Sequence, residues 1–362
     1  MQKGSIADLK HFDFRLCLKV TSKRFKCDGV PMSQRPIRIA INGFGRIGRT
    51  LLRILARRGS EFEIVLINDI EPLRTCAYLF EYDSVFGRWP GSVRTEPGTL
   101  MVDDQSIPFH AEPDLSRLDL TDVDLVMECT GMGGTRAVAE RGLLAGATAV
   151  LVSGPSAEAD ITLVMGANDD DLGSERIISN ASCTTNALAP LANVLDQAYG
   201  IVSGQMTTVH CYTGSQPTVD KPRDALERSR AAALSMVPTT TSAQHQTGLV
   251  LPRLKGRIEA RAIRVPTASV SAIDLTVQTE KPVSETHVNA LLQASADASD
   301  VFGWTEQPLV SADLRARPES IVMCGPETNV SVGGLLRVFG WYDNEWGFSC
   351  RMLDMARVIA SR

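Results

Sequence analysis

The sequence lacks the features that mark membrane, secreted and nucleic-acid-binding proteins. Its 362 residues contain no apolar run long enough to cross a bilayer. Its eight cysteines include no CxxC pair and no regular spacing, which argues against a disulfide framework and against a metal site. The net charge of −5 leaves no excess of basic side chains for nucleic acid. These absences favour a cytoplasmic protein without a membrane or nucleic-acid partner.

The first half of the chain alternates between apolar strands and helical patterns. Each strand is short and is closed by small or turn residues before a helical pattern begins. The strands are expected at Ile37–Asn42, Glu63–Asn68, Asp124–Glu128 and Ala147–Val152. Such alternation is typical of α/β proteins, and it predicts a Rossmann-type doubly wound parallel sheet.

After Cys183 the strand patterns are longer and their alternation is clearer. They are expected at Gln205–His210, Ala260–Val265, Ser269–Thr279 and Leu335–Tyr342. Helical patterns follow at Glu285–Ala298 and at Gly347–Ala360. This arrangement predicts an α+β catalytic domain with a mixed or antiparallel sheet and helices on one face.

A glycine-rich loop, Gly43-Phe44-Gly45-Arg46-Ile47-Gly48, joins the first strand to the first helix. Its first glycine permits a tight turn, its second a close approach of a pyrophosphate, and its third close packing of helix on strand. Asp69 ends the next strand, twenty-one residues after Gly48. A carboxylate there binds the adenosine ribose hydroxyls and repels a 2′-phosphate. The loop and the acid together predict NAD as the cofactor.

Cys183 stands at the start of an apolar helical stretch, with hydroxyls on both sides. The unpaired N–H groups of a helix start favour a thiolate and stabilise a forming oxyanion. His210, at the end of a predicted strand, is the candidate base. Alone, such a cysteine is more often a buried thiol and such a histidine more often structural. Beside a dinucleotide loop, a thiolate–imidazolium pair next to a hydride acceptor becomes the favoured interpretation.

The sequence resembles the phosphorylating glyceraldehyde-3-phosphate dehydrogenases in five signatures that occur in the same order, from about residue 37 to the C-terminus. The signatures are Ile41–Arg49, Asn180–Asn186, Thr207–His210, Arg264–Thr267 and Trp341–Glu345. The resemblance implies that Cys183 forms a hemithioacetal with a phosphorylated aldehyde, with His210 as general base. Inorganic phosphate then cleaves the resulting thioester. A homotetramer is implied by the resemblance alone.

The resemblance also assigns binding residues. The cofactor contacts are Gly43, Phe44, Gly45, Arg46, Ile47, Gly48, Asp69, Thr130, Ser153 and Asn344, the last orienting the nicotinamide carboxamide. Thr213 and Arg230 match the substrate-phosphate site, and Arg264 lies between the two anion sites. The site for inorganic phosphate matches Ser182, Thr184, Thr241 and Ser242. From the residues alone, Arg230 and Arg264 are more often solvated surface charges or members of ion pairs.

The sequence departs from the family pattern mainly near the second anion site. Thr241-Ser242 replaces the usual Thr-Gly, and no lysine follows in Ala243-Gln244-His245-Gln246. If that glycine is needed for a positive φ or for a close approach of the phosphate, serine would weaken the site. Erythrose-4-phosphate dehydrogenase, which releases its acid by hydrolysis, is therefore the alternative. A catalytically silent NAD-binding paralogue is a further one.

Three parts of the chain are predicted. Residues 1–36 form an extension outside the fold, either disordered or the product of a start codon placed too far upstream, with a targeting segment as the alternative. Residues 37–181, together with the C-terminal helix 345–362, form the NAD-binding domain. Residues 182–344 form the catalytic domain.

Overall fold

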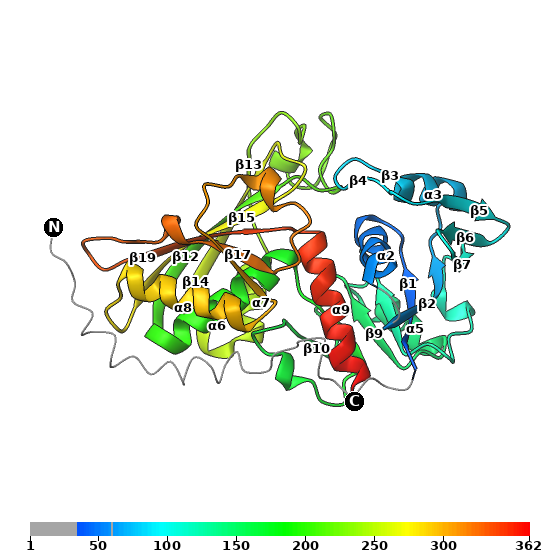
Figure 1. Ribbon diagram of the computed structural model, residues 1–362, viewed down its shortest axis with the longest axis horizontal. Coiled ribbons are helices and arrows are strands. Elements are labelled where there is room, and N and C mark those ends of the chain that lie inside the picture. The colour runs from blue at the N-terminus through cyan, green and yellow to red at the C-terminus, as the bar shows by residue number, and fades with distance from the viewer. Residues whose placement is uncertain (1–34, 59–60) are drawn as a thin grey trace.

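The computed structural model describes residues 35–58 and 61–362 (Figure 1). The predicted extension 1–36 lies outside the described residues except for its last two positions. Two sheets lie side by side, and the C-terminal helix α9 (Trp346–Ala360) runs between them. Helix α9 packs against α2 (Arg46–Arg58) and β9 (Ala149–Val152) of the first sheet layer and against α6 (Cys183–Tyr199) of the second.

The first sheet is parallel over most of its width, as predicted. From one edge its strands are β10 (Ile161–Thr162), β11 (Ile177–Ser179), β9, β8 (Leu125–Glu128), β1 (Ile37–Asn42), β2 (Phe62–Asn68), β7 (Gln105–His110), β6 (Thr99–Val102) and β5 (Val93–Glu96). Strand β1 pairs in parallel with β2 on one side and with β8 on the other. The chain order therefore reverses at β1. In doubly wound sheets such a reversal opens a ligand crevice at the carboxyl ends of the strands.

Strands β5, β6 and β7 form an antiparallel extension of this sheet that the sequence analysis did not predict. The sequence does carry turn residues for it: Gly98 lies in the turn between β5 and β6, and Asp103 in the turn between β6 and β7. Their φ values are 71° and 52°. Glycine and aspartate are residues that tolerate this left-handed backbone. The helices of this half are α2, α3 (Leu73–Glu81), α4 (Arg136–Ala139) and α5 (Arg141–Leu144), and a short hairpin pairs β3 (Tyr82–Asp83) with β4 (Gly87–Arg88).

The second sheet is mixed, which confirms the predicted fold class. Its strands follow the order β13 (Val237–Thr239), β14 (Ile258–Val265), β12 (Ile201–Cys211), β15 (Ser271–Thr279), β19 (Leu336–Tyr342), β17 (Ile321–Cys324) and β16 (Phe302–Thr305), with β18 (Asn329–Val330) beside β19. Strands β12 and β14 are parallel, whereas β12 and β15 are antiparallel. Helices α6, α7 (Ala243–Val250) and α8 (Glu285–Ala298) lie on one face of this sheet (Figure 1).

Helix α6 carries Cys183 at its first position and is buried along most of its length. Its apolar side chains, among them Leu188, Leu191 and Leu195, are completely buried. Burial of this kind contributes about 25 cal/mol per Å² of apolar surface, so the body of the helix anchors it firmly. Within residues 35–58 and 61–362, no helix is both long and apolar enough to cross a membrane.

Candidate active site

The first turn of α6 presents backbone N–H groups to the sulfur of Cys183. Ser182 caps the helix, and its hydroxyl accepts a hydrogen bond from the N–H of Thr185 at 3.1 Å. The residue before it, Ala181, has a φ of 55°, which turns the chain sharply into the helix. The N–H groups of Cys183 and Thr184 have no partner within the helix and lie close enough to the sulfur to lower its pKa.

His210 lies against Cys183, with its Nε2 atom 3.6 Å from Sγ. It is the second-last residue of strand β12 and lies opposite Arg264 of β14, because the parallel register pairs these two residues directly. The carbonyl oxygen of Cys211 can only accept, and it lies 2.7 Å from His210 Nδ1 and 3.0 Å from Arg264 Nη1. Arg264 Nη1, which can only donate, also lies 3.0 Å from Nδ1. The carbonyl is the shorter contact, so we assign the proton to Nδ1, and the lone pair of Nε2 then faces the sulfur.

Burial controls the protonation of this pair. It raises the pKa of the Cys183 thiol, an effect that Arg264 and the groups of Thr184 partly offset. Burial and the nearby Arg264 charge lower the pKa of His210 to about 4. At neutral pH the pair is therefore a thiol beside a neutral imidazole. Burial therefore disfavours the predicted resting thiolate–imidazolium pair, because desolvation penalises both charges.

The buried neutral His210 predicts a specific loss of stability in acid. The pKa of His210 is lowered from 6.5 to about 4 in the folded protein, so between these values the unfolded chain binds a proton that the native state does not. Neutral His210 therefore contributes about 3 kcal/mol to the free energy of unfolding. This contribution is fully present above pH 6.5 and is lost as the pH falls toward 4. Denaturant unfolding of wild type and His210→Asn at pH 7.5, 6 and 5 measures it. Equal losses in the two proteins would contradict the assignment.

Tyr342 is a site residue that the sequence analysis did not single out, although it lies within one of the signatures. Its hydroxyl is 2.9 Å from the hydroxyl of Thr184 and 2.8 Å from that of Thr208. Its ring meets the ring of His210 edge-on at 6.0 Å between centroids. Thr184 is buried, and its side chain contacts both Tyr342 and the sulfur of Cys183.

Gln246 is a second residue that sequence reasoning missed. It is buried on α7, and its Oε1 accepts hydrogen bonds from the N–H of Ser182 at 3.1 Å and from the hydroxyl of Thr185 at 3.0 Å. Through these two contacts α7 holds the first turn of α6. The sequence analysis noted only that a lysine was missing from this segment, because nothing local indicates that a glutamine will reach another helix.

Gln246→Ala is expected to loosen the start of α6. The change leaves the partly buried N–H of Ser182 without its acceptor and removes one of the two partners of the Thr185 hydroxyl, which costs about 1–3 kcal/mol of unfolding free energy. Alkylation of Cys183 by iodoacetamide should slow as well. Gln244→Ala is the matched control, since Gln244 lies on the same helix but bonds the N–H of Ala260. If both variants alkylate at the wild-type rate, Gln246 does not position the nucleophile.

The glycine-rich loop fits a dinucleotide. A Cβ atom on Gly43, whose φ is 92°, would lie 2.5 Å from the backbone nitrogen of Thr130. A Cβ on Gly48 would collide with the carbonyl oxygen of Gly43. At Gly45, by contrast, a Cβ would meet no atom within 4 Å, so this position opens onto free space. The loop therefore packs tightly at its ends and leaves room at the middle glycine, next to the unpaired N–H groups where α2 begins.

The other predicted cofactor residues follow neighbouring strands at the same edge of the sheet. Asp69 follows β2 and accepts a hydrogen bond from the N–H of Phe44 at 2.5 Å, which shapes the glycine loop. Thr130 follows β8, and its N–H and hydroxyl bond the carboxylate of the buried Glu128. Burial raises the pKa of Glu128. Ser153 follows β9. The crevice thus gathers residues that lie far apart in the sequence.

Asn344 lies just before α9, and the next residue ties this turn to the glycine loop. The guanidinium of Arg46 makes two bonds to the Glu345 carboxylate, at 2.8 and 2.5 Å, and also bonds Asp83. After Asn344, the chain is bonded through Glu345 to Arg46 on α2 of the first sheet layer. Before Asn344, the chain belongs to β19 of the second sheet. This arrangement places Asn344 where the two halves of the protein meet.

The predicted phosphate residues form bonds to residues near them in the sequence. Arg230 is exposed and pairs with Asp220 at 2.9 Å. The hydroxyl of Thr213 lies 2.9 Å from that of Ser215, and the hydroxyl of Thr241 accepts the N–H of Ala243 at 3.2 Å. Ser242 has a φ of −71°, an ordinary helical value. The concern that this position requires a glycine for a positive φ is therefore removed.

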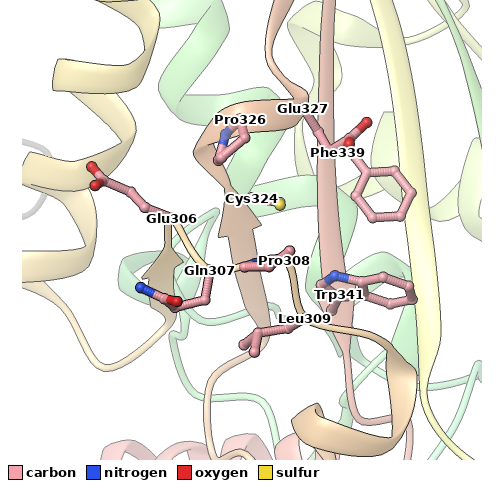
Figure 2. Close-up of a pocket in the computed structure, with 9 residues that line it drawn as sticks. All are labelled: Glu306, Gln307, Pro308, Leu309, Cys324, Pro326, Glu327, Phe339 and Trp341. Atoms are coloured by element: carbon pink, nitrogen blue, oxygen red, sulfur yellow. The ribbon is translucent and has the colours of Figure 1, made fainter.

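A hollow of about 430 Å³ lies elsewhere, over strands β16, β17 and β19 (Figure 2). Phe339 and Trp341 line it together with Glu306 and Glu327. Side chains alternate between the faces of a strand, so Trp341 points away from the face on which Tyr342 meets the nucleophile helix. None of the predicted site residues lines this hollow. It is separate from the site around Cys183.

Comparison with known proteins agrees with the signatures over nearly the whole chain. Residues 37–136 match the family model of the glyceraldehyde 3-phosphate dehydrogenase NAD binding domain, and residues 182–344 match that of its C-terminal domain. Among similar proteins, glyceraldehyde-3-phosphate dehydrogenase of Xanthobacter flavus is 46% identical over 88% of this chain and 97% of its own length. The enzyme of the same name from Zymomonas mobilis is 45% identical over 90% of this chain and 98% of its own.

A third relative, the glyceraldehyde-3-phosphate dehydrogenase of Streptomyces coelicolor, is 43% identical over 90% of this chain and 99% of its own length. The two matched ranges include the glycine-rich loop and the helix that carries Cys183. NAD is the cofactor. The chain belongs to the glyceraldehyde-3-phosphate dehydrogenase family of NAD-dependent oxidoreductases.

Proposed function

We propose that this protein oxidises glyceraldehyde 3-phosphate to 1,3-bisphosphoglycerate, with inorganic phosphate as the acyl acceptor and Cys183 as the nucleophile. The observation that carries the proposal is the 3.6 Å contact between Cys183 Sγ and a neutral His210 Nε2 at the start of α6. A thiol needs a base at this distance to become a nucleophile.

In the first half of the reaction, Cys183 Sγ attacks the aldehyde carbon while His210 Nε2 takes the thiol proton and returns it to the new hydroxyl. The N–H groups at the start of α6 stabilise the oxyanion that develops between these transfers. The product is a hemithioacetal on Cys183. Bound NAD supplies the hydride acceptor. His210 removes the hydroxyl proton of the hemithioacetal, and a thioester on Cys183 is left.

In the second half, an oxygen of inorganic phosphate attacks the thioester carbonyl and the carbon–sulfur bond breaks. The acyl phosphate leaves, and the Cys183 sulfur recovers a proton from His210. Over the cycle one hydride is transferred and one proton is released to solvent. The N–H groups of the α6 start serve this tetrahedral oxyanion as they serve the first one.

Arg230 and Thr213 are proposed to bind the substrate phosphate. The attacking phosphate is proposed to bind at Ser182, Thr184, Thr241 and Ser242, with Arg264 between the two sites. Arg230 must leave Asp220 to bind the substrate phosphate. Their side chains are 65% and 60% exposed, and such surface pairs contribute only about 0–1 kcal/mol. A bidentate arginine–phosphate contact is stronger than that. The Arg230–Asp220 ion pair can therefore form in the free protein and be replaced when the substrate phosphate binds.

Steady-state rates with two aldehydes test the proposal. We expect turnover of glyceraldehyde 3-phosphate that requires inorganic phosphate and produces an acyl phosphate. Erythrose 4-phosphate should be a poorer substrate. Faster turnover of the four-carbon aldehyde without phosphate would instead assign the hydrolytic erythrose enzyme. No turnover of either aldehyde, with NAD binding intact, would indicate a silent paralogue.

We also propose domain boundaries, an oligomeric state and a cellular compartment for this protein. We propose an NAD-binding domain of residues 37–181 with 345–362, and a catalytic domain of residues 182–344. A homotetramer is supported by four large apolar side chains that are at least 73% exposed in one segment, Val219, Leu226, Leu234 and Met236. A cytoplasmic location suits a reaction that needs Cys183 reduced. Sedimentation of the purified protein tests the tetramer.

A further inference from the structure

Cys211 is a buried thiol that the proposed reaction does not use. It is the last residue of β12, directly after His210, and is completely buried. Its Sγ atom lies 3.0 Å from Oδ1 of Asn344, which comes from the turn before α9. Its main-chain carbonyl meanwhile holds His210 and Arg264. One residue thus contacts both the base and the residue assigned to the nicotinamide.

The direction of the Cys211–Asn344 hydrogen bond follows from the chemistry of the two groups. Burial raises the pKa of the Cys211 thiol to about 12, so the thiol keeps its proton at neutral pH. A protonated thiol donates, and of the two ends of an asparagine amide only the oxygen accepts. The Oδ1 atom of Asn344 is therefore turned toward Cys211. Its Nδ2 atom, with two N–H groups, is turned away.

An asparagine amide can turn over by 180°, which exchanges its donor and its acceptor with little change in shape. For a residue that must bind a carboxamide, this exchange puts a hydrogen-bond acceptor where the ligand needs a donor. Without a partner for Oδ1, both orientations of Asn344 become accessible. The thiol removes this freedom by favouring one of them.

We propose that Cys211 is a positioning residue that holds the amide of Asn344 in one orientation, so that its N–H groups face the nicotinamide carboxamide of NAD. The proposal rests on the proposed function only for the role of Asn344. Cys211 itself touches neither the aldehyde nor the sulfur of Cys183. Its Sγ atom also lies 3.8 Å from Nδ1 of His210, a longer contact than the 3.0 Å to Asn344. The rate of Cys183 alkylation therefore has to be measured beside NAD+ affinity, to separate an effect through Asn344 from one through His210.

The test measures NAD+ binding in the full-length protein, by calorimetry, together with the rate of Cys183 alkylation without NAD+. Cys211→Ala should weaken NAD+ binding about tenfold, because it leaves a buried acceptor unpaired. Cys211→Ser, which keeps a donor, should restore binding to within about threefold. Both should leave alkylation unchanged, since the carbonyl that holds His210 is retained. Cys324→Ala, another buried thiol of the same sheet, is the control and should bind NAD+ normally.

A double mutant separates positioning from a general structural effect. In an Asn344→Ala background, Cys211→Ala should cause no further loss of NAD+ affinity. An equal loss in that background, unchanged affinity in Cys211→Ala, or a parallel fall in alkylation would each overturn the proposal. These readouts do not use an aldehyde. A failure of the proposed reaction would therefore show in the turnover assay while the NAD+ affinities still decide the role of Cys211.

Discussion

Cys183→Ala is expected to abolish aldehyde oxidation and rapid alkylation by iodoacetate together. Every covalent step of the proposed reaction passes through this sulfur, and loss of a nucleophile lowers turnover by at least about 10⁴-fold in enzymes of this kind. The fold should survive, because Cys183 is only partly buried and the body of α6 anchors the helix. Turnover with both aldehydes and mass spectrometry of the alkylated peptide measure the two effects.

The control for this variant is Cys76→Ala. Cys76 is a buried thiol on α3 whose pKa is raised to about 11, so it should contribute neither to turnover nor to rapid alkylation. Cys183→Ala should still bind NAD+, since the glycine loop and Asn344 are untouched. Substantial turnover in Cys183→Ala would exclude the covalent mechanism. Loss of NAD+ binding would instead indicate that the variant had not folded.

His210→Asn is expected to reduce turnover by about 10²–10⁴-fold, the usual contribution of a general base. Asparagine can still bond the Cys211 carbonyl, but it offers no basic nitrogen to Cys183. Because the pKa of His210 is lowered to about 4, the wild-type base is unprotonated throughout the range from pH 5 to 9. The alkylation rate of Cys183 should therefore rise with pH as the thiol ionises. It should show no step near pH 6.5.

The matched control is His245→Asn, since His245 is an exposed histidine on α7 and should not affect the rate. A measured alkylation profile with a step between pH 6 and 7 that disappears in His210→Asn would mean that His210 titrates there. Cys183 and His210 would then rest as a thiolate and an imidazolium, although burial disfavours both charges. Near-normal turnover in His210→Asn would remove the general-base role.

Local chemistry made much of this protein predictable from its sequence. The parallel sheet was predicted because strand–helix alternation and closing turn residues are short-range patterns. The glycine loop was predicted because the spacing of Gly43, Gly45 and Gly48 reflects requirements of one turn. The helix start at Cys183 was predicted because Ser182 caps it from the adjacent position. The β5–β7 extension could also have been found, from the turns at Gly98 and Asp103.

The sequence by itself thus determined the fold class, the dinucleotide loop and the nucleophile at its helix start, since each depends on residues close together in the chain. Only the tertiary structure decided what surrounds the sulfur. The β12–β14 register places Arg264 beside His210 across 54 residues, and Gln246 reaches Ser182 from another helix. Cys211 meets Asn344 across 133 residues. The protonation of the pair also belongs to the tertiary structure, because the helix-start effect is local whereas desolvation depends on everything packed around the two side chains.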